Sequence, residues 1–407
     1  MTAVNDNVAR RPAILYFGND WNAENRTCSR HIARCLAQQY EVYYIECPGM
    51  RAPKRSGRDL KKIARKLGRF LTGLREAGPG LHVQTLAQVP LHRFALIRWL
   101  NARLIYWTVR WLMWRHGIRR PILWFVVPHV SSLVGRLGES LSVYYVTDDH
   151  ASLPGVDAEA VRAMDETLTR KADLVFVASE TLLAGKKAVN PNTFHSPHGV
   201  DTEHFGRACA GGERAPDDIA GLPRPIIGFF GLIESWIDLE LVAYLAERRP
   251  QWSFVMIGRV AVPEDAAPRL PNLHFLGRRR YEDLPGYGRH FDAAIIPYKL
   301  TQQVIHANPL KLREYLAMGK PIVSVWTPET EKFADVIEVA RGREQFLAKL
   351  DKVMGQPDSQ EAVRCRMDRV ASMSWEARVA EVLEVVEASL ASKMQALSSV
   401  ATVANGS

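Results

Sequence analysis

The sequence lacks the features of disulfide-stapled, zinc-binding and membrane-spanning proteins. Its 407 residues include five cysteines, an odd number, and none forms a C-x-x-C pair or a Cys/His zinc spacing. We therefore expect reduced cytoplasmic thiols and no structural metal. The N-terminus has no signal-peptide core, and the longest apolar stretch, residues 104–114, contains Arg110. It is far shorter than the roughly 20 residues of a spanning helix, so we expect no transmembrane segment.

Acidic residues are scarce in one part of the N-terminal half. Residues 51–80 hold ten basic side chains and two acidic ones, and residues 81–120 hold no acid at all. The whole chain carries a formal charge of +9. This excess predicts an anionic partner. Nucleic acid is not favoured, because the sequence has no aromatic-basic RNA-binding motif and no helix-turn-helix pattern.

Short apolar runs alternate with longer helical stretches, which is the pattern of βαβ units on parallel sheets. The runs are residues 13–17, 42–45, 122–126, 143–146, 174–177, 226–230, 254–257, 293–296 and 322–325. A Gly/Ala/Pro/Asp-rich stretch interrupts the series. We therefore predict an α/β chain of two doubly wound, Rossmann-like domains. The expected bounds are 1–206, a linker at 207–224, and 225–390 with a last helix packing back on the first domain, followed by a flexible tail at 391–407.

The segment at residues 308–321, NPLKLREYLAMGKP, predicts a helix with chemistry on one face. Asn308 is suited to the N-cap and Gly319 to the C-terminal end. Lys311 and Glu314 share one face, three residues apart. A lysine in the first turn favours a phosphate, and a carboxylate one turn later can accept hydrogen bonds from a vicinal diol. The alternative is an exposed ion pair on a core helix.

Several segments resemble the GT-B glycosyltransferases, specifically the glycosyltransferase 4-like and teichuronic-acid-type enzymes of bacterial polysaccharide synthesis. Besides the helix at 308–321, they include GFFGLIESWIDLELVAYLAERRPQWSFVMIG at 228–258, LPNLHFLGRRRYEDLPGYGRHFDAAIIPY at 270–298, and SPHGVDTEHF at 196–205. GNDWNAENRTCSRHIARCLAQQYEVYYIE at 18–46 and VYYVTDD at 143–149 are similar too. The resemblance implies the GT-B fold, with its two domains facing across a cleft.

The resemblance also implies roles for residues of the C-terminal half. Glu314 would hold the donor ribose, while Lys311 and the helix start at Asn308 would hold the diphosphate. The chain departs from the family at His306, where many relatives carry a glutamate, and at 232–236, where many carry an Arg/Lys pair. The remaining residues that we expect in the donor site are Gly231 under the phosphates, Arg278 near the base, Arg259 as a replacement cation, and Tyr298.

Asp148 and Asp149 follow an apolar run, at the strand end where ligands of α/β sheets bind. Transfer of a sugar needs the acceptor hydroxyl to lose its proton, and a carboxylate can take it. Similar enzymes that invert configuration place a catalytic aspartate in this loop. Two alternatives stay open, a helix N-cap and a metal site.

The loop after the first apolar run is a candidate acceptor site. Asp20 and Trp21 lie in this loop, and Arg26 and Arg30 lie on the helix that follows. If this surface faces the cleft, the arginines suit a phosphate-bearing acceptor. The alternative is an ordinary polar helix face.

An apolar stripe with helical spacing runs through Ile97, Leu100, Leu104, Trp107, Trp111 and Trp114. Such a stripe can pack on its own sheet. Because seven arginines lie between Arg93 and Arg120, it also suits an anionic bilayer interface.

We therefore expect a cytoplasmic glycosyltransferase, peripheral on the inner face of the plasma membrane. It would move a sugar from a nucleotide diphosphate to a lipid-linked or polysaccharide-precursor hydroxyl, without a metal or other cofactor. The alternatives are a nucleotide-sugar epimerase of the same fold and a non-catalytic nucleotide-sugar binder.

Overall fold

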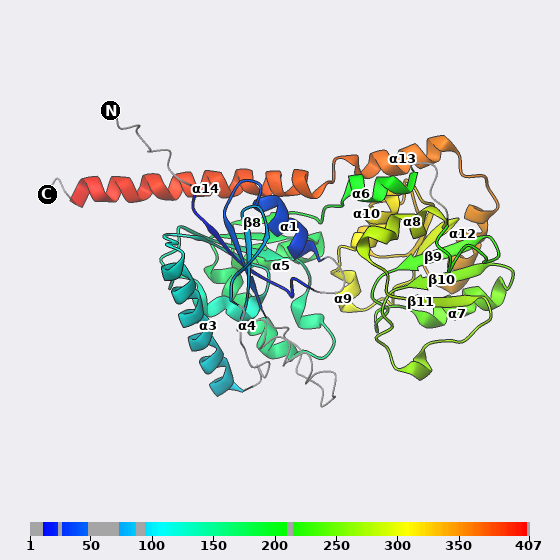
Figure 1. The fold of residues 1–407 in the computed structure, drawn as a ribbon, viewed down its shortest axis with the longest axis horizontal. Helices are drawn as coiled ribbons and strands as arrows, with labels where there is room; N and C mark the ends of the chain where they lie inside the picture. The colour runs from blue at the N-terminus through cyan, green and yellow to red at the C-terminus, as the bar shows by residue number, and fades with distance from the viewer. Residues whose placement is uncertain (1–10, 23–26, 48–72, 87–93, 210–214, 405–407) are drawn as a thin grey trace. The chain divides into compact units, whose positions relative to one another are not determined.

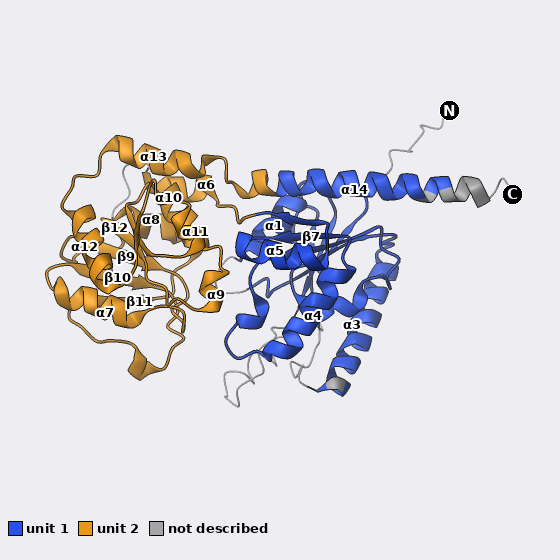
Figure 2. Ribbon diagram, turned by 180° about the vertical axis from the view of Figure 1, so that it is seen from behind, with its two compact units in different colours: residues 1–196, 379–407 blue, residues 197–378 orange. Residues whose placement is uncertain are grey.

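The computed structural model describes residues 11–22, 27–47, 73–86, 94–209 and 215–404. The chain divides into two compact units (Figure 2). Unit 1 comprises residues 1–196 and 379–407, and unit 2 comprises residues 197–378.

Unit 1 is built on a sheet with the strand order β3-β4-β2-β1-β5-β6-β7-β8. All neighbouring strands are parallel except β3 and β4. The strands are β1 (Ile14–Gly18), β2 (Val42–Glu46), β3 (Arg75–Gly78), β4 (Leu81–Thr85), β5 (Ile122–Phe125), β6 (Leu141–Val146), β7 (Leu174–Val177) and β8 (Thr193–His195). The helices are α1 (Cys28–Leu36), α3 (Ala95–Arg115), α4 (Ala158–Lys171), α5 (Glu180–Val189) and most of α14 (Trp375–Ala404), with 3-10 turns η1 (Pro128–Leu133) and η2 (His150–Ser152).

The two faces of this sheet carry different side chains, because successive residues of a strand point to opposite faces. One face packs against α3, α4 and α5 through aliphatic residues such as Leu15, Ile105 and Leu168. The other face carries a row of aromatic rings that crosses six strands, stacked in every pair but the last, which is tilted. The row runs through Tyr44, Tyr16, Trp124, Tyr145, Phe176 and Phe194. Figure 1 shows α3 and α4 on one side of the sheet and α1 on the other.

Unit 2 is a parallel sheet with the strand order β11-β10-β9-β12-β13-β14. The strands are β9 (Ile226–Phe230), β10 (Ser253–Ile257), β11 (Leu273–Gly277), β12 (Ala293–Ile296), β13 (Ile322–Val325) and β14 (Glu338–Ala340). The helices are α6 (Thr202–Gly206), α7 (Leu239–Arg248), α8 (Leu284–Arg289), α9 (Gln302–Ile305), α10 (Leu310–Ala317), α11 (Pro328–Glu331), α12 (Arg343–Met354) and α13 (Gln360–Ala371). The 3-10 turns are η3 (Arg207–Cys209), η4 (Glu264–Ala266) and η5 (Tyr281–Asp283).

Helices cover both faces of the second sheet. Ile226 and Ile322 point to the side of α10, whereas Ile227 and Val323 point to the side of α7 and α12. The strand order reverses between β9 and β12, so the connections after these neighbouring strands lead in opposite directions. Ligands of open α/β sheets bind at such a switch point, outside the carboxyl ends of the strands. The prediction of two doubly wound domains is confirmed.

The division into units differs from the expected domain bounds. Residues 207–224, expected as a linker, belong to unit 2, where Ile219 is buried in the core. Residues 391–404, expected as a flexible tail, continue α14, and Lys393 pairs with Asp173 at 2.5 Å. Helix α14 begins in unit 2 and belongs to unit 1 from Val379 on.

Helix α3 does not pack its tryptophan stripe on the sheet, so that alternative is wrong. Its buried apolar residues are Ile105, Val109, Leu112 and Met113, while Trp107 and Trp111 are more than half exposed. No helix within the described ranges is long and apolar enough to cross a membrane.

Candidate functional site

Helix α10 presents Lys311 to the switch point of unit 2. The backbone N–H of Phe230, the last residue of β9, donates to the hydroxyl of Tyr315 at 2.9 Å, and this bond fixes α10 against the strand end. One turn before Tyr315, the aliphatic part of Lys311 crosses directly over Gly231. A Cβ at position 231 would overlap Lys311 Cε and would lie 2.8 Å from Nζ. A side chain at position 231 would therefore force the lysine to move.

Gly231 and Gly258 form a tight pair of turns at the ends of β9 and β10. Their φ angles are +148° and +147°, which side-chain-bearing residues rarely adopt. A Cβ on Gly258 would overlap the carbonyl oxygen of Gly231. The Gly231 N–H donates to Ile257 at 2.8 Å, and the Gly258 N–H donates to Gly277 at 2.8 Å. Three strand ends are thereby drawn together beneath Lys311.

Glu314 is half-buried on α10, three residues after Lys311. Burial raises the pKa of Glu314, the Lys311 ammonium lowers it, and the Asp201 carboxylate adds to the rise. No residue in the described part of the chain forms a hydrogen bond or ion pair with this carboxylate. A desolvated carboxylate without a donor costs free energy in the unliganded protein. It is therefore suited to accept hydrogen bonds from a ligand.

Asn308 is not the N-cap that we predicted. The helix begins at Leu310 with Pro309 in the cap position. The Asn308 amide is buried and donates to Glu329 Oε1 at 2.9 Å. The same oxygen accepts from Arg313 at 2.6 Å. The Asn308 side chain, bound to Glu329, thus holds the first turn of α10 in place from inside the protein.

The other three residues expected at the donor site lie on the segments after β10, β11 and β12. Arg259 follows the β10 turn, and its carbonyl accepts from Ile233 at 3.0 Å. Tyr298 follows β12 and forms a β-bridge with Ile237. Arg278 follows Gly277 at the end of β11 and is exposed. All three residues therefore lie on the segments that follow the carboxyl ends of the strands.

In unit 1, Asp148 and Asp149 follow β6 as predicted. Asp149 caps the 3-10 turn η2, accepting from the Ala151 N–H and from the Ser152 hydroxyl. The N-cap alternative is thus confirmed for Asp149. Asp148 accepts from the Asp149 N–H at 2.8 Å. Both carboxylates are half-buried.

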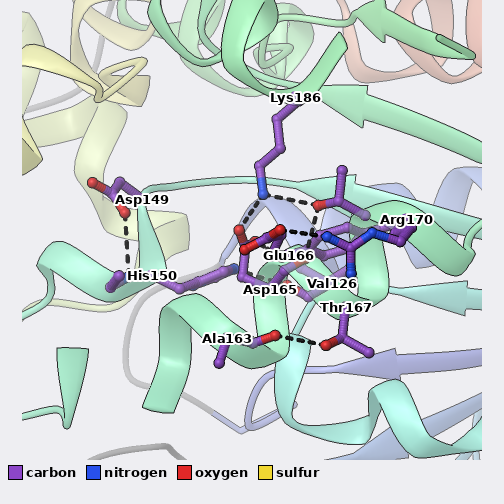
Figure 3. A network of polar contacts seen from close by, with 12 residues as sticks. Val126, Asp149, His150, Ala163, Asp165, Glu166, Thr167, Arg170 and Lys186 are labelled. Carbon is purple, nitrogen blue, oxygen red and sulfur yellow. Dashed lines mark hydrogen bonds and ion pairs between the residues drawn. The ribbon is translucent and has the colours of Figure 1, made fainter. Parts of the chain in front are cut away.

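The residue after this pair, His150, is buried and joined to the sheet. Its Nε2 lies 3.0 Å from the Val126 carbonyl, so Nε2 carries the proton and donates. Burial lowers the pKa of His150, which favours the neutral ring. The neighbouring network of Asp165 and Lys186, shown in Figure 3, joins α4 to α5. These contacts therefore hold the loop of Asp148 and Asp149 in place on unit 1.

The candidate acceptor loop is only partly in the described residues. Arg26 lies outside them. Trp21 is buried, and its backbone N–H donates to Glu46 Oε1 at 3.0 Å. The Arg30 guanidinium lies 5.0 Å from the centre of the Trp21 ring. Asp20 accepts from the Asn22 N–H at 3.0 Å.

The start of α1, at Cys28, lies near Asp148. Burial raises the pKa of the Cys28 thiol to about 12, and the charge of Asp148 adds to the rise. Asp148 therefore lies close to the helix that carries Arg30.

Several residues that hold these sites in place were not predicted from the sequence. Glu46 ends β2 and fixes the Trp21 loop; Glu329 fixes the start of α10; Tyr315 fixes its position on β9. A signal was available for Glu329, because its segment T-P-E-T carries a capping threonine and a proline at the first helical position.

Residues 224–354, which contain the Lys311 and Glu314 site, match the family model "Glycosyl transferases group 1". The chain is 24% identical over 408 residues to the "Putative teichuronic acid biosynthesis glycosyltransferase TuaH" of Bacillus subtilis strain 168, covering 90% of this chain and 94% of that protein. Sucrose-phosphate synthase of Thermosynechococcus elongatus has a TM-score of 0.68 at 14% identity, covering 94% and 100% of the two chains. HepE of Anabaena, in complex with UDP and glucose, has a TM-score of 0.65 at 13% identity, covering 92% and 99%.

The similar structures are GT-B glycosyltransferases, so the predicted fold is confirmed. The family match lies on the unit that carries the candidate donor site, and TuaH extends the similarity over most of the chain. The chain is therefore a glycosyltransferase with the GT-B fold, and its residues 224–354 are similar to the group 1 glycosyltransferases.

Proposed function

We propose that this glycosyltransferase moves a sugar from a nucleotide diphosphate to a hydroxyl of a lipid-linked or polysaccharide-precursor acceptor. The observation that carries the donor part is the position of Lys311 over Gly231, with the Glu314 carboxylate on the same helix. A cation above a glycine turn suits a diphosphate, and a desolvated carboxylate suits the two hydroxyls of a ribose. The similar protein HepE was solved in complex with UDP and glucose, which supports the same class of donor.

In the proposed reaction, the bond between the sugar's anomeric carbon and the diphosphate oxygen breaks, and the acceptor oxygen forms the new bond. Negative charge grows on the departing diphosphate. Lys311 and the N-terminal turn of α10 would stabilise this charge, so the proposal includes no metal ion. Gly231 leaves the phosphates room to approach, and Arg259, Arg278 and Tyr298 would complete the donor site.

The acceptor hydroxyl must lose its proton during transfer. We assign this step to Asp148 rather than Asp149, because both oxygens of Asp149 already accept hydrogen bonds within η2. Asp20, Trp21 and Arg30 would contact the acceptor. A phosphate on a lipid-linked acceptor would suit Arg30.

The acceptor class is supported by the name of the similar protein TuaH, which refers to teichuronic acid biosynthesis. We accordingly place the enzyme in bacterial polysaccharide or exopolysaccharide synthesis, in the cytoplasm and peripheral on the inner face of the membrane.

A thermal-shift screen of nucleotide diphosphate sugars tests this proposal. A donor present at a hundred times its Kd should stabilise the protein by about 2.7 kcal/mol. The stabilising donor, radiolabelled in the sugar, should then transfer label to a bacterial lipid or polysaccharide extract. If no nucleotide diphosphate sugar stabilises the protein, the proposal is wrong. A new free sugar nucleotide formed without any acceptor would indicate an epimerase instead.

A further inference from the structure

Helix α3 of unit 1 is apolar on two opposite sides. Ile105, Val109 and Leu112 pack into the core of the sheet. On the other side Trp107 is 62% exposed, Trp111 55% and Trp114 77%. Eight of the eleven large exposed hydrophobic side chains in the described part of the chain lie between Phe94 and Trp114. Contiguous exposed apolar surface on this scale marks an interaction site.

The exposed face of α3 also carries positive charge. Arg103, Arg110 and Arg115 are exposed along the helix. The Arg103 guanidinium lies 4.9 Å from the centre of the Trp99 ring, so cation and aromatic ring share one surface. The sequence contains no aspartate or glutamate between Glu76 and Glu139.

These two properties restrict what can cover the face. The partner must accept tryptophan and leucine side chains and must carry negative charge next to its apolar part. A second copy of the chain would bring the same arginines against each other, with no acid on α3 to pair them. Anionic lipid meets both requirements, because its phosphates lie directly above its acyl chains.

We propose that the exposed face of α3 lies in the interface of a bilayer that contains anionic lipid. Trp107, Trp111 and Trp114 would occupy the boundary between headgroups and acyl chains, where tryptophan is enriched. The arginines would extend to the phosphates. The helix would lie in the plane of the surface, because its opposite side is part of the unit 1 core. The inference rests on the proposed function only in that a lipid-linked acceptor would be found at the same surface.

Vesicle binding tests this inference without any donor or acceptor. The probe is vesicles of equal parts phosphatidylglycerol and phosphatidylcholine, with phosphatidylcholine vesicles as the comparison. The tryptophan variant is Trp107→Ser/Trp111→Ser/Trp114→Ser, and the charge variant is Arg103→Gln/Arg110→Gln. The matched controls change residues of similar exposure elsewhere, Leu300→Ser/Met394→Ser for the first and Arg269→Gln/Arg343→Gln for the second.

The wild type and both controls should sediment with the anionic vesicles, and salt should weaken this binding without abolishing it. The charge variant should bind about fivefold more weakly for each arginine that reaches the surface. The tryptophan variant should lose the part of the vesicle binding that persists at high salt. Brominated lipid should quench the fluorescence of the wild type more strongly than that of the tryptophan variant, which keeps Trp99 as the exposed tryptophan of α3.

Three results would overturn the inference. The first is a wild type that does not bind anionic vesicles at low salt. The second is a tryptophan variant that binds these vesicles as well as its control, which would assign vesicle binding to other basic residues. The third is a wild type that is a dimer in sedimentation velocity without lipid while the tryptophan variant is a monomer, which would make the face an interface between copies of the chain. In each case the thermal-shift screen of donors would still report on the transferase activity, because α3 belongs to unit 1 and the candidate donor residues belong to unit 2.

Discussion

Lys311 crosses over Gly231, and a Cβ at position 231 would overlap its side chain. We therefore expect Gly231→Ala to displace the ammonium and to weaken binding of the nucleotide diphosphate by about tenfold or more, the loss of about 1.4 kcal/mol. Isothermal titration calorimetry measures this affinity.

Gly342→Ala is the matched control for this variant. Gly342 also has a positive φ, +101°, but a Cβ there would meet no neighbouring atom within 4 Å. Both variants should lose stability through backbone strain, of about 1 to 3 kcal/mol. Only Gly231→Ala should lose affinity for the nucleotide diphosphate. Equal affinity in the two variants would mean that Lys311 does not need its position over the glycine.

Glu314→Gln should stabilise the unliganded protein at neutral pH. Burial raises the pKa of Glu314 above its usual 4.5, so the folded state disfavours the ionised carboxylate. The amide removes this penalty. The gain should be present above the raised pKa and should vanish as the pH falls below 4.5, where the carboxyl is protonated in both states.

Thermal melts between pH 4 and pH 8 measure this difference, with the exposed Glu240→Gln as control. A Glu314→Gln variant that is less stable than the wild type at pH 7 would show that the carboxylate is paired within the protein.

Asp148→Asn should abolish sugar transfer and leave donor binding intact, because the amide cannot take the acceptor's proton. Asp149→Asn should retain much of the activity, since an asparagine can still accept a hydrogen bond from the Ala151 N–H. Initial rates at saturating donor measure both effects. Full activity of Asp148→Asn would remove this residue from the chemistry, and the reverse ranking would make Asp149 the base.

A chelator should leave the transfer rate unchanged, because Lys311 and the start of α10 provide the charge that a metal would otherwise supply. The measurement compares initial rates with EDTA and with added Mg²⁺ or Mn²⁺. A rate that falls with EDTA and recovers with one of these ions would contradict the proposal of a metal-free site.

The strands could be predicted from the sequence because parallel strands buried on both faces read as continuous apolar runs. Every run that we assigned to a strand is one. Strands β3, β4, β8, β11 and β14 were missed, since polar residues such as His82, His195, His274 and Glu338 break their apolar pattern.

The candidate donor site depended on contacts that local sequence rules do not reveal. Lys311 and Glu314 could be placed on one helix face, but the packing of Lys311 on Gly231 joins segments eighty positions apart in the chain. Asn308 was assigned to the cap because its residue type favours that position, whereas its amide is used by the buried Glu329. In α3 both sides are apolar, so periodicity could not decide which one is buried.

The central claim is that Lys311 and Glu314 bind a nucleotide diphosphate. Calorimetric titration of UDP, GDP, ADP and dTDP into the wild type, Lys311→Met and Glu314→Gln tests it most directly. We predict that one nucleotide binds the wild type at one site per chain, and that each variant loses about 1.5 to 3 kcal/mol of binding free energy, the scale of hydrogen bonds to charged groups. Equal affinity of the wild type and both variants, or no binding of any nucleotide diphosphate, would contradict the claim.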